Sequence, residues 1–151
     1  MPGSFNFRTP KGNPVATSEA VYTANVTVTG GREGHAASDD GALNLDLQRP
    51  GGPKDATNPE QLFAAGYAAC FQSAMAGIGR QQGIDTSNST ILSAVSLIKD
   101  GHFYKLGVDF KISIPGVDRA AAEALVEQAH QVCPYSNAMR GNVEVNLEIV
   151  D

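Results

Sequence analysis

Residues 62–79 form a run of Ala, Gly and larger apolar side chains that two polar residues interrupt. Asn58 and Pro59 precede the run and suit the N-cap and first position of a helix, and Gly83 suits its C-terminal end. Because the predicted helix is apolar on almost every side, it needs cover from other elements. A membrane span is the alternative, but the run is short, rich in Ala and Gly and polar near its centre. Its small residues predict close packing of a second helix, across a dimer or within the chain.

Alternating apolar residues predict β-strands on both sides of this helix. A second, amphipathic helix begins after its N-cap Asp118 and ends before Pro134. Its apolar face consists of Ala122, Leu125, Val126, Ala129, Val132 and Cys133. The predicted strands cover residues 21–29, 35–38, 43–47, 90–98, 106–114 and 143–149. The order β-β-β-α-β-β-α-β, rich in hairpins, predicts an α+β domain with antiparallel sheets around central buried helices.

Composition narrows the class of protein. The chain has 151 residues and a net charge of −5, with no Lys/Arg run, which argues against nucleic-acid and anionic-membrane binding. Pro- and Gly-rich residues 1–20 predict a flexible arm, and residues 21–151 one domain. No apolar segment of the kind found in signal peptides occurs in the arm, so we expect a cytoplasmic protein.

The two cysteines, Cys70 and Cys133, are too few for a disulfide-stapled domain, and no C-x-x-C motif occurs. His130 lies three residues before Cys133, but two ligands do not make a zinc site. Either cysteine can be a small core residue. A reactive Cys70 would need a fixed cation to lower its pKa, because it lies too far along the helix for the dipole to act. Arg32, in the turn Gly-Gly-Arg-Glu-Gly, is the best candidate, and Glu60 can serve as its carboxylate partner.

Three separated motifs carry a family resemblance. Residues 57–71, Thr-Asn-Pro-Glu-Gln-Leu-Phe-Ala-Ala-Gly-Tyr-Ala-Ala-Cys-Phe, closely resemble the reactive-cysteine signature of the organic hydroperoxide resistance branch of the Ohr/OsmC family. Residues 129–138 resemble the second-cysteine motif of that family, and residues 22–34 its N-terminal hairpin. The match spans about residues 21–150, and the arm before it departs from the family.

The resemblance implies a thiol-dependent peroxidase built as an intertwined homodimer. By motif position, Cys70 is the peroxidatic cysteine, Cys133 the resolving one, and Arg32 with Glu60 the activating charged pair. The implied substrates are organic hydroperoxides, including those of fatty acids, and the implied reductant is a dihydrolipoyl group on a partner protein. The implied chemistry requires no metal, haem or flavin.

The residues near Cys70 in sequence suggest how a substrate would be selected. Apolar surroundings would favour organic hydroperoxides over hydrogen peroxide, and Phe63, Tyr67 and Phe71 are the candidate substrate-binding residues. Two other classes stay open from the residues alone. One is a non-catalytic protein that binds an apolar ligand and has core cysteines. The other is a cysteine hydrolase with His130 as base, although a nucleophile in mid-helix lacks the usual turn.

Glu60 and Cys70 pose a geometric conflict. They lie ten residues apart on one predicted helix, which separates them by about 15 Å along its axis and turns them about 80° apart. Either the helix is broken near Gly66, or Glu60 acts on Cys70 of a partner subunit. The capping signals and the continuous apolar run favour an intact helix. We therefore expect a dimer with two sites across its interface.

Overall fold

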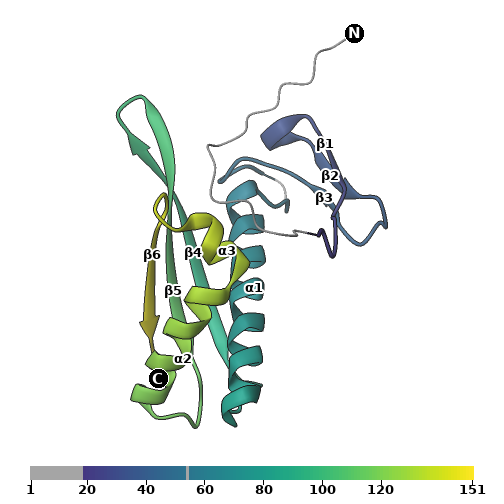
Figure 1. The fold of residues 1–151 in the computed structure, drawn as a ribbon. Coiled ribbons are helices and arrows are strands. Elements are labelled where there is room, and N and C mark those ends of the chain that lie inside the picture. The colour runs from purple at the N-terminus through teal and green to yellow at the C-terminus, as the bar shows by residue number, and fades with distance from the viewer. Residues whose placement is uncertain (1–18, 54) are drawn as a thin grey trace.

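The computed structural model describes residues 19–53 and 55–151, so almost all of the predicted arm over residues 1–20 lies outside the described part. The chain forms two small sheets, and a long helix, α1 (Pro59–Gln82), runs between them (Figure 1). The element order agrees with the predicted β-β-β-α-β-β-α-β, with a short 3₁₀ turn and a third helix added.

The N-terminal sheet is small and exposed. It contains β1 (Val26–Thr29), β2 (His35–Ser38) and β3 (Asn44–Asp46), all antiparallel and in that order. The 3₁₀ turn η1 (Gly31–Glu33) joins β1 to β2. The strand predicted from residue 21 begins only at Val26, and all four of its residues are exposed. The sheet lies beside the N-terminal end of α1 (Figure 1).

Helix α1 begins and ends where its sequence predicts. The Asn58 side chain accepts a hydrogen bond from the Gln61 N–H, and Pro59 occupies the first turn, where a missing N–H costs nothing. Gly83 ends the helix with a φ of 70°, in the left-handed region that favours glycine. The helix is continuous over 24 residues, so no break occurs near Gly66.

The second sheet contains a long hairpin, β4 (Thr90–Asp100) and β5 (Phe103–Ser113), with β6 (Glu144–Ile149) beside β5. Strand β6 runs parallel to β5, which corrects the prediction of purely antiparallel sheets. The reason is the connection: a helical crossover separates the two strands, and it carries the chain back to the end where β5 began.

The crossover consists of α2 (Arg119–Val132) and α3 (Pro134–Met139). Asp118 caps α2 by accepting a hydrogen bond from the Ala121 N–H, as predicted. Pro134 ends α2 and at the same time opens α3, which the sequence prediction missed. Val132 was predicted on the buried face but is 56% exposed, because it falls in the last position of α2 beside this corner.

The main core lies where α1, α2 and the inner face of β4–β6 meet. The buried residues of α1 are Tyr67, Phe71, Met75 and Gly79. The rest of the helix is half-buried or exposed, so one chain does not supply the cover predicted for it. By length and composition α1 could cross a membrane, a test that the core helices of soluble proteins also pass; 22% of its most apolar window is buried within one chain. A face of small residues, among them Ala65 and Ala69, remains open.

Candidate active site

The two cysteines, 63 residues apart in sequence, face each other in the structure. Cys70 projects from the middle of α1, and Cys133 occupies the corner between α2 and α3. Their Sγ atoms lie 3.6 Å apart, with the Cys133 thiol as donor, and both residues are free thiols. Cys133 is fully buried and Cys70 half-buried. The sulfurs are close enough for a disulfide to form after a small movement, since the bond itself needs about 2.05 Å.

The surroundings of Cys70 within one chain disfavour its thiolate. Burial raises the pKa of the Cys70 thiol, and the Tyr135 backbone N–H opposes that rise, while the neighbouring Cys133 adds to it. A reactive Cys70 needs a fixed cation to lower this pKa. The candidate cation, Arg32, is paired with Glu60 in this chain.

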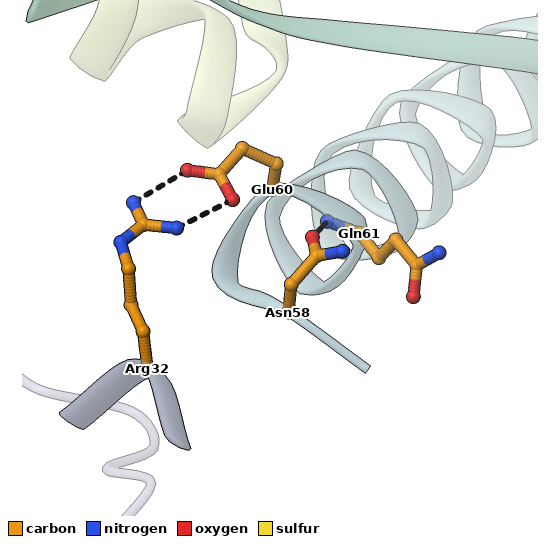
Figure 2. A network of polar contacts seen from close by, with 4 residues as sticks. All are labelled: Arg32, Asn58, Glu60 and Gln61. Atoms are coloured by element: carbon orange, nitrogen blue, oxygen red, sulfur yellow. Dashed lines mark hydrogen bonds and ion pairs between the residues drawn. The ribbon is translucent and has the colours of Figure 1, made fainter. Parts of the chain in front are cut away.

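Arg32 forms a two-pronged ion pair with Glu60 at the N-terminal end of α1. Its Nη1 donates to Glu60 Oε2 at 2.8 Å and its Nη2 to Oε1 at 2.6 Å, as Figure 2 shows. The guanidinium hydrogen bonds lower the pKa of the Glu60 carboxyl, despite partial burial. The tight turn that presents Arg32 needs Gly34, because a Cβ there would overlap the Thr29 carbonyl oxygen. The residue partnership predicted from sequence is therefore present.

The charged pair and the thiol pair do not meet within one chain. Glu60 and Cys70 are separated by ten residues of unbroken helix, about 15 Å along the axis. A cavity of about 430 Å³ lies at the charged pair rather than at the thiols. Ala64, Ser93 and Val95 line it, and the buried Ser93 hydroxyl has no hydrogen-bond partner among the residues that the structure describes. One chain thus keeps the charged pair and the thiol pair apart.

Aromatic residues surround the thiol pair, but not all can reach a ligand. Tyr67 and Phe71 have no exposed surface, so the prediction that they touch substrate is corrected: they pack on Phe110 in the core and support the site from beneath. Phe63 is half-buried and stacks on Tyr135, which is 41% exposed. Phe63 and Tyr135 are therefore the aromatic rings that a ligand can contact.

A buried polar chain beside the thiols was missed by the sequence reasoning. The Ser136 hydroxyl lies 2.8 Å from the Tyr67 hydroxyl and 3.0 Å from His130 Nδ1. The signal was available, since His130 and Ser136 flank Cys133 by three residues on either side. His130 is thus held by Ser136 through its Nδ1 atom. In the described part of the chain, no three His, Cys, Asp or Glu side chains gather as a metal site would require.

Comparisons with known proteins agree with this architecture. A family model described as OsmC-like protein matches residues 51–148. The organic hydroperoxide resistance protein OhrB of Bacillus subtilis is 49% identical over 136 residues, which cover 86% of this chain and 98% of that protein. Its crystal structure superposes with a TM-score of 0.82, over 87% of this chain and all of the other. An organic hydroperoxide resistance protein from Legionella pneumophila gives the same TM-score at 49% identity, over 88% of this chain and all of the other.

Proposed function

This chain belongs to the OsmC-like family, in its organic hydroperoxide resistance branch, and on that premise we propose that it is a thiol-dependent peroxidase that reduces organic hydroperoxides to alcohols. The relatives support a role in hydroperoxide detoxification. The observation that carries the peroxidase chemistry is the pair of free thiols, Cys70 and Cys133, with sulfurs 3.6 Å apart.

The chemistry has two steps. The Cys70 thiolate attacks one oxygen of the peroxide, the O–O bond breaks, and the alcohol leaves after taking up a proton. Cys70 becomes a sulfenic acid, and Cys133 then attacks its sulfur, so that an S–S bond forms and water leaves.

An external dithiol reopens the disulfide by exchange and is itself oxidised. We propose a dihydrolipoyl group on a partner protein as that dithiol.

The first step needs a thiolate, and in the part of the chain that the structure describes no cation acts on the pKa of Cys70. We propose that the partner subunit's Arg32, held by the partner subunit's Glu60, completes the site in a homodimer. Two observations support this assembly. The small-residue face of α1 is open, and large apolar residues are exposed on the β4–β5 hairpin, with Phe103 79% exposed. An isologous dimer would then contain two equivalent sites.

The ligand-accessible surroundings are apolar. Phe63 stacks on Tyr135, whose backbone hydrogen-bonds to Cys70. The cavity at the charged pair has aliphatic side chains such as Val95 and Leu97 in its lining. Such surroundings favour a peroxide with a hydrocarbon tail, fatty-acid hydroperoxides among them, over hydrogen peroxide. Apolar area that leaves water on binding contributes about 25 cal/mol per Å².

Thiol titration tests the proposal. Fully reduced protein is treated with one equivalent of tert-butyl hydroperoxide, and free thiols are counted before and after. A peroxidase loses both thiols, whereas a protein that only binds an apolar ligand, or a cysteine hydrolase, loses neither. Hydrogen peroxide at the same concentration is the matched oxidant, and it should react more slowly.

A further inference from the structure

Helix α3 contacts the rest of the fold through the ring of Tyr135 and through one buried hydroxyl. Ser136 is the buried residue of this six-residue helix and is fully enclosed. Its Oγ lies 2.8 Å from the Tyr67 hydroxyl of α1 and 3.0 Å from His130 Nδ1 of α2. A serine hydroxyl can donate one hydrogen bond and accept two, so it can bridge both groups at once. The bridge joins three helices at a single point.

The hydrogen bonds of Ser136 also bear on the position of Cys133. Cys133 is the residue between α2 and α3, and its carbonyl accepts a hydrogen bond from the Asn137 N–H of α3. Its sulfur must approach Cys70 from 3.6 Å to about 2.05 Å to form a disulfide. Tyr67, one turn before Cys70 on α1, holds Ser136, one turn after Cys133. The two hydroxyls therefore fasten together the two segments that carry the two thiols.

We propose that Ser136 is a positioning residue for disulfide formation, which holds Cys133 where it traps the Cys70 sulfenic acid before a second peroxide reaches it. This inference rests on the proposed function and goes beyond it. Two reactions compete for the same sulfenic acid. In one, the Cys133 thiol displaces hydroxide, and the disulfide and water result. In the other, a second hydroperoxide transfers an oxygen atom, and Cys70 becomes a sulfinic acid while an alcohol leaves.

Removing the hydroxyl should shift this competition. Without Ser136 Oγ, the buried Tyr67 hydroxyl loses its partner in the docked position of α3, so that position loses part of its advantage over displaced ones. A loss of about 1.4 kcal/mol lowers the ratio of docked to displaced α3 tenfold. Cys133 then reacts more slowly, and the second peroxide gains time.

The experiment compares Ser136→Ala with wild type during exposure to excess tert-butyl hydroperoxide. Mass spectrometry measures the ratio of sulfinic acid at Cys70 to Cys70–Cys133 disulfide. Because both products arise from the same sulfenic acid, their ratio does not depend on the rate of the first step. We expect it to rise, by up to about tenfold. Tyr67→Phe keeps the ring and removes only the hydroxyl, and it should raise the ratio in the same direction even where Ser136→Ala folds poorly.

Ser89→Ala is the matched control. Ser89 is also a buried serine, and its hydroxyl accepts a hydrogen bond from Gln72 of α1. Gln72 points about 200° around the helix from Cys70. This variant loses a comparable buried hydrogen bond and should keep the wild-type ratio.

Four results would overturn the inference or separate it from the function. A wild-type ratio in folded Ser136→Ala and Tyr67→Phe would remove Ser136 from the mechanism, as would an equal rise in Ser89→Ala. Effects that simply multiply in the double variant would also contradict a shared hydrogen bond, since residues in one network are not additive. Wild-type protein that forms neither product would instead refute the peroxidase proposal itself.

Discussion

Sheet β4–β6 lies under three helices and shares with them a core of twelve buried residues, whereas in the described residues before α1 the buried hydrophobics are Ala36 and Leu47. The same contrast holds for single strands. Val108 of β5 is 1% exposed, but Val28 of β1 is 55% exposed. The C-terminal region therefore carries its own core, and the N-terminal sheet is held largely by local hydrogen bonds and by the contact of Arg32 with Glu60.

The two regions also differ in the reactive groups that they carry. The well-packed region contains both thiols, whose approach needs rigid helices, and the exposed sheet presents the guanidinium that the thiolate lacks. A charge kept at the surface avoids the desolvation cost of a buried ion until a partner surface covers it. This difference supports the proposal that the guanidinium of one chain acts on the thiol of a second copy.

The largest effect is expected in the C-terminal region. Cys70→Ser should abolish peroxidase turnover, because it removes the nucleophile. Cys133→Ser should still consume about one equivalent of peroxide and then stall, because the sulfenic acid has no resolving thiol. Peroxide consumption measures both, with excess dithiol for Cys70→Ser and without added dithiol for Cys133→Ser, because a dithiol can itself reduce a sulfenic acid. Full turnover by Cys70→Ser would mean that Cys70 is not the peroxidatic cysteine.

A matched pair of valines compares the stability of the two regions. Val108→Ala removes buried methyl groups and leaves a cavity, so we expect a loss of about 2 kcal/mol in the free energy of unfolding. Val28→Ala changes an exposed strand and should alter it by less than about 0.5 kcal/mol. Urea denaturation measures both. A comparable loss in Val28→Ala would mean that another surface covers β1, so that the two regions would not differ in burial.

Local signals in the sequence predicted the parts of the fold that local chemistry determines. Asn58, Pro59 and Gly83 gave the ends of α1, and Asp118 gave the start of α2, because caps depend on neighbouring residues. The partnership of Arg32 with Glu60 followed from the need of a guanidinium for a carboxylate.

Those local signals do not predict features that depend on residues far apart in the sequence. The parallel pairing of β5 with β6 depends on where the crossover returns the chain, which no local pattern contains. Pro134 was interpreted as a stop, although the same residue type opens helices. The pairing of Cys70 with Cys133 came from family resemblance alone. The sequence indicates the apolar surroundings that raise the pKa of Cys70, but it does not say how far Arg32 lies from that thiol.

A smaller effect should appear within the N-terminal sheet as pH changes. His35 and Asp46 face each other across β2 and β3, and the carboxylate hydrogen bond, with help from Asn44, raises the pKa of His35. A raised pKa means that this contribution is fully present below about pH 6.5 and is lost as pH rises through the folded-state value. In an NMR titration, Asp46→Asn should lower the His35 midpoint, whereas Asp100→Asn in the β4–β5 hairpin should not. An unchanged midpoint in Asp46→Asn would show that the pair does not form.

The claim that joins the two regions is that Glu60 with Arg32 of one chain serves Cys70 of another. Heterodimers of Cys70→Ser and Glu60→Ala chains test it most directly, because one of their two sites would combine an intact Cys70 with an intact Glu60. Heterodimers of Cys70→Ser and Cys133→Ser chains are the control. They should not turn over, because Cys70 and Cys133 face each other within one chain.

The measurement is peroxide turnover with excess dithiol in isolated heterodimers, compared with each parent homodimer. We expect the Cys70→Ser and Glu60→Ala heterodimer to recover activity in half of its sites, while both parents stay impaired. Turnover no higher than the mean of the two parents would contradict it, because Cys70 would then not draw on the Glu60 of the other subunit.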